Sequence, residues 1–395
     1  MKRIFQWTAL FLLAALLVGC GSGRPGAAAS GASGVELFAA SVGKGDALLL
    51  RVDGWTGLID TGKASARGKV LAAMREVGAE ALDAVFITHT DGDHTGGLSW
   101  LAASDIPVGT WYASAMYTGV KPEKHGAVKA AALRGQEVQW LQRGDSVPFG
   151  ESGAALKVLA PSRRFEDKDD NNSLVMLLET SQGRMLFTGD MERPEEAELL
   201  AQGDDLSCAV LKAPNHGDDD TVSEAFARAV SADVVVISTD GQEKPGTPNP
   251  GVVARLTAAG GACYVTENAA LGIRVTLEDG AASAEYVDID EAATEGVFIE
   301  RVAPGDDLVT VRNSGAARDL TGWYLYSDRG GELYAFPDGF ALEAGQAVTV
   351  GTRSSEAGTY QLLWDDKKVI HKSKADDILL YDGWGRCVDR VSNGL

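Results

Sequence analysis

Two histidines and two aspartates lie within one six-residue segment, HTDGDH at positions 89–94. Imidazole nitrogens and carboxylate oxygens are ligands for zinc, manganese and similar divalent ions. A solvated acidic turn rarely carries two histidines at this spacing, and the glycines at 96 and 97 let the backbone fold tightly around an ion. The segment therefore predicts a metal centre, at which a bound ion would activate water for hydrolysis.

The apolar run AVFIT (84–88) leads directly into this cluster and is typical of a buried strand. Between Val35 and about Glu278, short β-rich runs such as DALLLRV alternate with helical ones such as KVLAAMREVGA. This alternation predicts an α/β domain in which strand ends carry the candidate ligands. After Asp279 the pattern changes, because residues 298–395 contain strand-like runs separated by Gly, Asp and Pro turns. This second segment predicts a small all-β sandwich.

The N-terminus has the pattern of an export signal, with a basic head at 1–3, an apolar run to Leu17 and a small-residue cleavage site before Cys20. The LVGC ending resembles the lipobox of bacterial lipoproteins, which implies that a lipid on Cys20 attaches the chain to a membrane. A cleaved signal without a lipid, or an uncleaved anchor, is the alternative. Residues 20–34 are small and flexible, as a tether would be. We therefore expect a membrane-anchored, extracytoplasmic protein at the bacterial cell surface.

Charge and cysteine content restrict the possible partners and cross-links. The net charge of −20 argues against a protein that coats nucleic acid through its overall field, although a local basic channel is compatible with it. The acidity could equally serve solubility. The three cysteines after Cys20 are too few for a dense disulfide framework, and a Cys208–Cys263 bridge or buried free thiols, including Cys387, both remain open.

The segment HTDGDHTGGL resembles the signature loop of the metallo-β-lactamase superfamily, in the His-x-Asp-x-Asp-His form of the ComEC-like hydrolases. The neighbouring motifs also follow that family's order. They are SVGKGDALLL (41–50), LIDTG (58–62), NNSLV (171–175), LFTGD (186–190), LKAPNHGD (211–218) and VVVIS (234–238). The resemblance covers nearly all of residues 35–285 and implies an αββα sandwich.

The same resemblance implies a centre of two divalent ions, zinc or manganese. One ion would be held by Asp93, His94, Asp190 and His216, and the other by His89, Asp91 and Asp190. Asp93 would also orient a metal-bound hydroxide, which makes it the predicted catalytic residue. Because Asp91 stands in place of an imidazole, the ligands of the second ion are harder, and the preference of the centre shifts from zinc towards manganese.

Residues outside the ligand set could support the site or contact the substrate. These candidates are Asp46, Asp60, Asn172, Ser173, Lys212 and Asn215. Each also has a simpler interpretation, since an Asp beside glycine often forms a turn, an Asn or Ser can cap a strand, and a lone Lys is usually solvated. The remaining histidines, His125 and His371, lie in charged surroundings, and we expect both at the surface.

Three positions depart from the ComEC-like pattern. The chain has Ser41 where the family commonly has Asp, Asn215 where it usually has the first His of a pair, and Thr247 where it usually has His in a Gly-His-Pro motif. The predicted ligands survive these changes, whereas the residues that handle the substrate are altered. Metal binding is therefore the firmer expectation, and turnover the weaker one.

The C-terminal segment resembles a lamin tail domain, an immunoglobulin-like sandwich. Its marks are LVTVRNSGAARDLTGWYLYS (308–327), FPDGFALEAGQAVTVG (336–351) and DDILLYDGWGRCVDRV (376–391). The resemblance implies that this domain docks a surface partner or substrate, and a passive stabilising role is the alternative. The expected order is a signal peptide (1–19), a tether (20–34), the hydrolase domain (35–287), a linker (288–296) and the lamin-tail-like domain (297–395).

Together these features predict an exported, lipid-anchored, metal-dependent hydrolase. A phosphodiesterase or nuclease is favoured, with extracellular nucleic acid as its substrate. One alternative keeps the metal chemistry and acts on a lactone or another small ester. A further alternative is a non-catalytic surface binding protein with a degenerate site.

Overall fold

The structure is a computed structural model that describes residues 34–288 and 296–394. The predicted signal peptide, the lipidation site Cys20, the tether up to residue 33 and the linker residues 289–295 lie outside the described residues. Within the two described ranges, no helix combines the length and the hydropathy needed to cross a bilayer.

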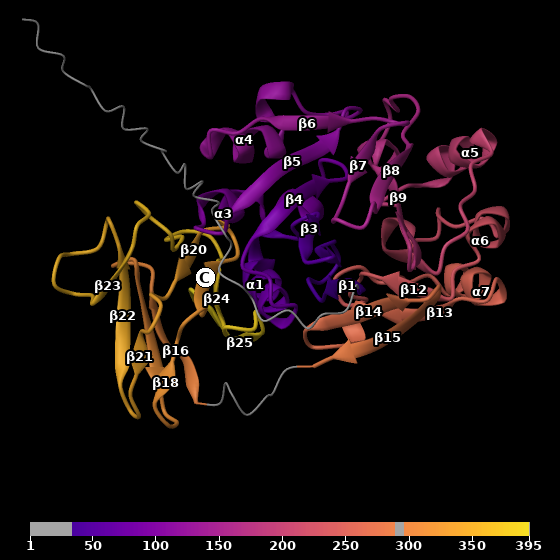
Figure 1. Cartoon of the computed structure of the whole chain (residues 1–395). Coiled ribbons are helices and arrows are strands. Elements are labelled where there is room, and N and C mark those ends of the chain that lie inside the picture. Colours follow the sequence, from indigo (N-terminus) through magenta and orange to yellow (C-terminus); the bar gives the residue numbers. More distant parts are fainter. Residues whose placement is uncertain (1–33, 289–295, 395) are drawn as a thin grey trace, which may run out of the picture. The chain divides into compact units, whose positions relative to one another are not determined.

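Two mixed sheets pack face to face in the first described range, with helices on both outer faces (Figure 1). Sheet one contains, in spatial order, β15 (Ala281–Val287), β14 (Gly272–Glu278), β1 (Val35–Ala40), β2 (Leu48–Val52), β3 (Trp55–Ile59), β4 (Leu82–Ile87), β5 (Val108–Ser114) and β6 (Val138–Leu141). Sheet two contains β13 (Ala262–Val265), β12 (Val234–Ile237), β11 (Val210–Lys212), β10 (Gly183–Phe187), β9 (Val175–Thr180), β8 (Ala155–Ala160) and β7 (Ser146–Pro148). Leu50 and Phe86 of sheet one share a buried cluster with Met176 and Phe187 of sheet two. This αββα sandwich confirms the predicted α/β fold.

Helices cover the outer faces because their apolar sides pack onto the sheets. Sheet one carries α1 (Arg67–Glu76), α3 (Leu98–Ala103) and α4 (Gly126–Leu133), and sheet two carries α5 (Arg193–Gln202), α6 (Glu224–Val230) and α7 (Pro250–Ala258). Val70 of α1 shares a buried cluster with Phe38 of β1, and Phe226 of α6 shares another with Leu177 of β9. The remaining short helical turns are α2 (Gly92–Thr95) and the 3₁₀ helices η1 (Ala64–Ala66), η2 (Pro122–Lys124), η3 (Asp169–Asn172), η4 (Pro214–Gly217) and η5 (Thr266–Asn268).

Parallel strands bring the candidate ligands to one end of both sheets. Strands β3 to β6 are parallel, and so are β10 to β13. His89 follows β4, Asp190 follows β10 and His216 follows β11. The backbone N–H of Leu174, just before β9, donates to the carbonyl of Thr88 at 3.0 Å, which joins the two sheets at this end. Ligands from both layers can therefore converge on one centre.

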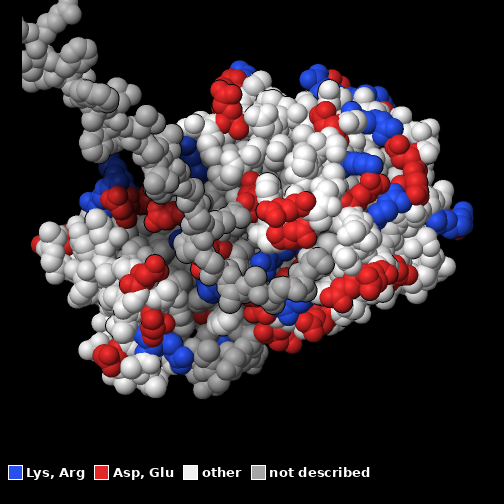
Figure 2. All heavy atoms as spheres, in the orientation of Figure 1, with Lys and Arg blue, Asp and Glu red and all other residues white. Residues whose placement is uncertain are grey.

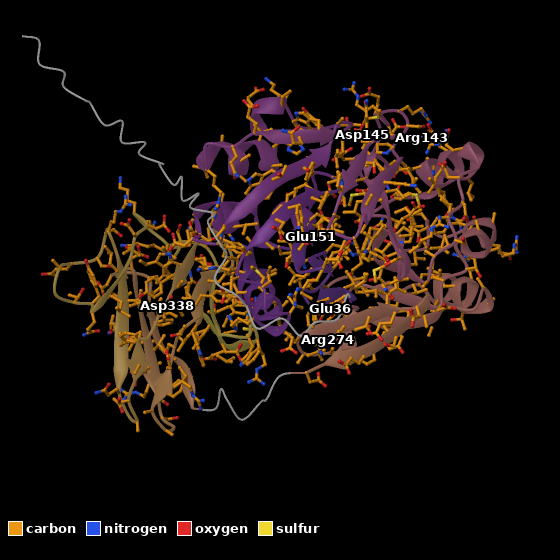
Figure 3. All side chains as sticks on the ribbon, in the orientation of Figure 1. Glu36, Arg143, Asp145, Glu151, Arg274 and Asp338 are labelled. Carbon is orange, nitrogen blue, oxygen red and sulfur yellow. The ribbon has the colours of Figure 1, made fainter. Side chains whose placement is uncertain are left out.

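A charged network at the edge of sheet one links it to its covering helix. Arg274 of β14 lies beside Glu36 of β1 at 3.0 Å (Figure 3), and it also reaches Glu76 of α1 at 2.5 Å and Glu285 of β15 at 2.9 Å. Burial lowers the pKa of Arg274, but the three carboxylates raise it by more. Because the network is partly exposed, solvent screens much of its contribution to stability.

The second described range, from Gly296, is all-β. One sheet contains β16 (Val297–Ala303), β17 (Leu308–Asn313), β22 (Ala347–Thr352) and β23 (Leu362–Trp364). Another contains β20 (Leu333–Ala335), β19 (Tyr324–Ser327), β24 (Asp377–Tyr381) and β25 (Cys387–Ser392). A short pair is formed by β18 (Arg318–Asp319) and β21 (Ala341–Leu342). Val311, Leu325 and Trp364 belong to the buried cluster of these strands. The predicted all-β sandwich is confirmed.

One histidine was placed wrongly by the sequence. His125 is only 2% exposed, because its ring packs against Tyr117 and Trp140 at centroid distances of 4.8 and 5.2 Å. Aromatic rings distant in sequence, rather than the charged neighbours along the chain, decide its surroundings. The structure also answers the open question on cysteines, since Cys208, Cys263 and Cys387 are all free thiols. Cys208 is buried as expected, whereas Cys263 is only partly buried and Cys387 is exposed.

Glu195 of α5 gives a prediction about stability. It is 1% exposed, and neither carboxylate oxygen has a hydrogen-bond partner among the described residues. Burial, with smaller effects from Glu198 and Asp169, raises the pKa of Glu195 well above its ordinary value of 4.5. The unfolded chain therefore releases this proton at lower pH than the folded chain. Folding stability should fall as pH rises above about 4.5, by about 1.4 kcal/mol per pKa unit of separation.

Glu195→Gln removes this titration without changing the shape of the side chain. We expect the variant to gain stability relative to the wild type between pH 4.5 and pH 8, as measured by urea unfolding with a chelator present. Exposed Glu151 supplies the control Glu151→Gln, which should follow the wild type at both pH values. Equal stability differences at pH 4.5 and pH 8 would contradict a neutral buried Glu195.

Candidate metal centre

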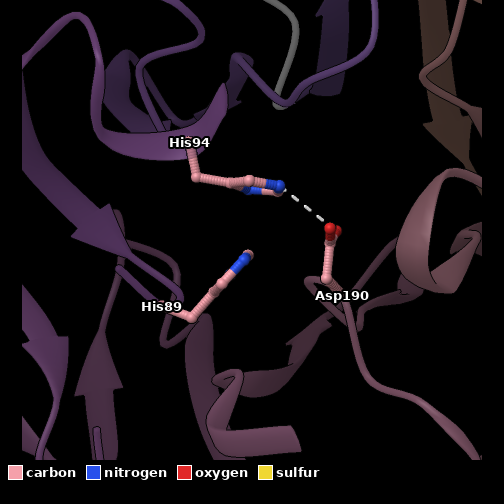
Figure 4. Close-up of side chains that lie close together, drawn as sticks. All are labelled: His89, His94 and Asp190. Carbon is pink, nitrogen blue, oxygen red and sulfur yellow. Dashed lines mark ion pairs between the residues drawn. The ribbon is translucent and has the colours of Figure 1, made fainter. Parts of the chain in front are cut away.

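Three imidazole rings and a carboxylate converge where the two sheets meet. Figure 4 shows His89 and His94 beside Asp190. Nε2 of His94 lies 3.2 Å from Oδ1 of Asp190, and Nε2 of His216 lies 3.0 Å from Oδ2 of the same carboxylate. The rings of His89 and His94 have centroids 4.2 Å apart. The structure thus brings together predicted ligands that are separated by more than 100 positions in the sequence.

Hydrogen bonds behind the rings fix their orientation. Nδ1 of His94 lies 2.7 Å from Oδ2 of buried Asp60, and Nδ1 of His216 lies 2.7 Å from the carbonyl oxygen of Ser238. In each ring Nδ1 therefore carries a proton, which leaves Nε2 as the atom that would bind an ion. Carboxylates and carbonyls commonly hold metal-binding histidines in this way.

The turn before Asp190 requires glycine. Gly189 has φ +49°, and a Cβ atom there would meet the side chain of Ser173 at 2.8 Å. The close approach lets the hydroxyl of Ser173 accept a hydrogen bond from the backbone N–H of Asp190 at 3.0 Å. Ser173, predicted to support the site or contact the substrate, thus positions the loop that carries Asp190.

The backbone that presents His216 adopts an uncommon conformation. Asn215 and His216 have φ values of 39° and 55°, in the left-handed region that costs non-glycine residues about 1–3 kcal/mol. The N–H of Asn215 donates to the carbonyl of Gly189 at 3.2 Å, which holds this turn against the Asp190 loop. Such strained residues cluster at functional sites, and Asn tolerates the left-handed region better than most residues.

The two aspartates of the HTDGDH segment point to different neighbours. Asp93 accepts a hydrogen bond from the ammonium group of Lys44 and lies 3.7 Å from Nε2 of His216. Asp91 is exposed and groups instead with Asp170, with candidate ligand atoms within 4.8 Å. Asp93 therefore lies on the His216 side of the centre, and Asp91 lies on the Asp170 side.

The electrostatics of the centre favour a bound cation. Burial lowers the pKa of His94, but Asp190 and Asp60 raise it by more, to well above its usual value. Burial raises the pKa of Asp190, but the neighbouring imidazoles hold it well below the usual range. Asp170 has no imidazole that lowers its pKa by a comparable amount. Burial and the charges of Asp190 and Asp91 raise the pKa of Asp170 to about 7.

The donor atoms fit divalent metal ions. Buried Nε2 of His89 and Oδ1 of Asp190 have no hydrogen-bond partner in the part of the chain that the structure describes. Nδ1 of His89 lies 3.0 Å from the hydroxyl of Thr88, so Nε2 is available as a ligand. The donors form two overlapping groups whose ligand atoms lie within 4.8 Å of one another, namely His89, His94 and Asp190, and Asp93, His94 and His216. These residues could hold two ions.

Comparison with known families identifies the arrangement. A family model of the metallo-beta-lactamase superfamily matches residues 40–241, which include all the predicted ligands. The chain belongs to this superfamily. A model of the lamin tail domain matches residues 290–394, which confirms the predicted C-terminal module.

The relatives of this metallo-β-lactamase chain include competence proteins. Competence protein ComA of Neisseria gonorrhoeae is 30% identical over 247 residues, which are 62% of this chain and 32% of that protein. ComE operon protein 3 of Bacillus subtilis (strain 168) is 27% identical over 161 residues, which are 41% of this chain and 20% of that protein. The chain thus spans about a third or less of these relatives, and the ComEC-like resemblance is confirmed.

Solved structures of metallo-β-lactamase fold proteins are also similar. The protein YhfI from Bacillus subtilis is 12% identical, with a TM-score of 0.39 over 64% of this chain and 100% of that one. The class B3 di-zinc metallo-beta-lactamase LRA-12, from an Alaskan soil metagenome, is 12% identical, with a TM-score of 0.30 over 46% of this chain and 75% of that one.

Two predicted supporting residues of the metallo-β-lactamase domain form a buried ion pair. Nζ of Lys212 lies 2.8 Å from Oδ2 of Asp46 and donates to the carbonyl of Ala213 at 2.8 Å. Lys212 is 1% exposed, so the simpler interpretation as a solvated lysine is wrong, and internal partners occupy its ammonium group. Oδ1 of Asp46 lies 3.9 Å from Nδ1 of His216, so the ion pair adjoins that candidate ligand.

Asn172 has a structural role in its loop. Its side chain accepts from the N–H of Phe165 at 2.7 Å and donates to the carbonyl of the same residue at 2.9 Å. It is completely buried, so the alternative in which it contacts substrate is not supported.

Thr247 stands at the third departure from the family pattern. Its hydroxyl pairs with that of Thr239 at 2.7 Å and donates to the carbonyl of Lys244 at 2.9 Å. Internal hydrogen bonds thus occupy the Thr247 hydroxyl.

Sequence reasoning missed two residues at the centre, Lys44 and Asp170. Both adjoin or lie within motifs that were recognised, since Lys44 is part of SVGKGDALLL and Asp170 directly precedes NNSLV. Their positions in or beside recognised motifs were therefore a signal in the sequence, but neither a lysine nor an aspartate is distinctive on its own. Only the folded structure places Lys44 against Asp93 and Asp170 near His89.

Asp60→Asn is expected to weaken metal binding by about 10–100-fold, the usual effect of losing a carboxylate behind a metal-binding histidine. An amide nitrogen facing Nδ1 of His94 would favour the tautomer with the proton on Nε2, which cannot bind an ion. Equilibrium dialysis with Mn²⁺ or Zn²⁺ measures the change.

Asp53→Asn is the matched control, because Asp53 lies in the β2–β3 turn, at the opposite end of β3 from Asp60, and accepts from the N–H of Ser152. Its metal affinity should equal that of the wild type. An affinity in Asp60→Asn within twofold of the wild type would rule out the orienting role.

Proposed function

We propose that this metallo-β-lactamase domain is a phosphodiesterase, with nucleic acid as the favoured substrate, which uses two divalent ions of zinc or manganese. When bound, such ions polarise a phosphoryl group and increase the acidity of water. Asp93, with a side chain 16% exposed, is positioned to accept a proton from that water while contacting the centre.

The observation that carries this proposal is the position of Lys44. Its ammonium group contacts Asp93 and interacts electrostatically with Asp190 and Asp46. A quarter of its side chain is exposed. Burial lowers the pKa of Lys44, but these carboxylates raise it by more, so the group stays cationic. A fixed cation at the solvent side of the centre suits a substrate with an anionic phosphate oxygen. A neutral lactone has no corresponding charge.

The contact with nucleic acid would be local. Figure 2 shows acidic and basic side chains interspersed over the face in view, and the net charge is −20. Binding therefore depends on a few phosphates near Lys44, rather than on a broad basic surface. The competence proteins among the relatives are consistent with a substrate of this class.

We also propose, from the N-terminal sequence, that a lipid on Cys20 anchors the chain outside the cytoplasm and that the lamin tail domain docks a surface partner. Labelling of growing cells with a fatty-acid analogue should modify the wild type and leave Cys20→Ser unmodified. Equal labelling of both proteins would contradict the anchor.

The test of activity uses the full-length protein loaded with Mn²⁺ or with Zn²⁺. Linear DNA, a chromogenic phosphodiester and a chromogenic lactone are supplied separately. We expect hydrolysis of both phosphodiesters. Hydrolysis of the lactone alone, or of no substrate at full metal occupancy, would overturn the proposal.

Lys44→Gln separates the charge of Lys44 from general effects on the protein. We expect it to slow phosphodiester hydrolysis, mainly through KM, while exposed Lys129→Gln on α4 behaves as the wild type. Unchanged kinetics in Lys44→Gln would show that Lys44 does not bind the phosphate, and the position of Lys44 would then not support the proposal.

A further inference from the structure

A second group of candidate ligands lies beside the predicted set. A ring nitrogen of His89, an oxygen of Asp91 and an oxygen of Asp170 lie within 4.8 Å of one another. Nε2 of His89 lies 3.9 Å from Oδ1 of Asp170, which is too long for a hydrogen bond and leaves space between the two atoms. The buried Nε2 has no hydrogen-bond partner among the described residues, so an unpartnered donor atom points into this group.

Neighbouring contacts hold Asp170 in place. The preceding residue, Asp169, accepts from the N–H of Thr90 at 2.9 Å and from the N–H of Thr118 at 2.6 Å. Thr90 lies between His89 and Asp91, so these bonds fasten η3 directly to the ligand loop. The following residue, Asn171, donates to Glu192 at 3.0 Å. Asp170 is thus held on both sides with its carboxylate towards the centre.

Without Asp170 the second predicted ion has fewer protein ligands than the first. The first ion has two imidazoles and two carboxylates available, from Asp93, His94, Asp190 and His216. The second has only His89, Asp91 and the shared Asp190. Three protein ligands leave a position open for water, as in catalytic sites, and a fourth protein ligand on a fixed segment would hold the ion more tightly.

We propose that Asp170 is a ligand of the second metal ion, completing a site with His89, Asp91 and Asp190. The inference rests on the two-ion centre proposed above. One imidazole nitrogen and three carboxylates make a hard donor set, so this site prefers manganese to zinc. The other site, with two imidazoles, accepts either ion. The chain therefore contains two unequal sites rather than a symmetrical pair.

The test measures metal binding, independently of hydrolysis. The full-length protein is dialysed against increasing Mn²⁺, and bound ions are counted by elemental analysis and by electron paramagnetic resonance. We expect two Mn²⁺ ions per wild-type chain. Asp170→Asn should weaken one site by at least about tenfold, because even residues behind a ligand change metal affinity by this much. The other site should change by less than threefold.

Two further variants define the comparison. Asp167→Asn removes an exposed carboxylate three positions away, and it should bind two ions as the wild type does. Asp91→Asn should weaken the same site as Asp170→Asn, and the double variant should therefore lose only that ion. Anomalous diffraction from manganese-soaked crystals should place one ion within about 2.5 Å of Asp170 Oδ1 or Oδ2.

The outcomes separate this proposal from the proposed function. If the wild type binds two ions and Asp170→Asn binds both with unchanged affinity, Asp170 is not a ligand and the two-ion hydrolase remains. If both sites weaken equally, the effect is a general one of charge, and direct ligation is also rejected. If the wild type binds fewer than two ions, the two-ion centre and the ligand assignment are both overturned.

Discussion

Replacement of Asp190 by Ala is expected to reduce bound metal from two ions to at most one and to abolish hydrolysis. Its two carboxylate oxygens face His94 and His216 at 3.2 and 3.0 Å, and it also groups with His89. No other carboxylate in the described residues reaches all three imidazoles. Elemental analysis after dialysis, together with turnover of a phosphodiester, measures both effects.

Asp105→Ala is the control for the loss of a carboxylate. Asp105 is exposed and precedes β5, and because β4 and β5 are parallel it lies at the opposite end of sheet one from His89. This variant should keep two ions and full turnover. Thermal unfolding of both apo proteins shows whether the Asp190 variant is folded. A folded Asp190→Ala protein that retains both ions would remove Asp190 from the centre.

Asp93→Asn is expected to lower kcat by about 10²–10⁴-fold at saturating metal, the usual contribution of general acid–base catalysis. The amide keeps an oxygen that can bind an ion, but it cannot accept a proton from water. It also loses the ion pair with Lys44. The substitution therefore tests the proton-accepting role more directly than truncation to Ala would.

The kinetics must be measured with the ions in place. Mn²⁺ is added until turnover no longer increases, and metal content is checked in the same sample. The pH dependence of kcat distinguishes a lost base from a disturbed structure, because the acidic limb of the profile should disappear with Asp93. Normal kcat with an unchanged pH profile would move the proton acceptor to another residue.

The sequence predicted best the parts of the site that are local. The HTDGDH ligands follow a single strand, so the apolar run before them was enough to place them at a strand end. Asp190 and His216 come from a different sheet, and their spacing alone did not identify them. Their assignment depended on the order of family motifs. In the structure Asp190 lies 3.0 Å from His216 and 3.2 Å from His94, and the Nε2 atoms of the two imidazoles are 3.3 Å apart.

The features that the sequence could not supply depend on contacts between distant segments. Asp170 reaches the centre because Asp169 binds the backbone of Thr90, 79 positions earlier. Lys212 is buried because Asp46 neutralises it, although a lone lysine is usually solvated. In each case a partner far along the chain determines the role, and residue type alone does not.

The position of the centre between the two sheets has a consequence for folding. His89 and His94 belong to one layer, and Asp190 and His216 belong to the other, so a bound ion acts as a cross-link between halves that otherwise meet through apolar packing. Without it, several carboxylates face one another across the seam. An ion at 100 times its dissociation constant would add about 2.7 kcal/mol of stability. Metal supply would then set not only the activity of the domain but also its resistance to unfolding and proteolysis.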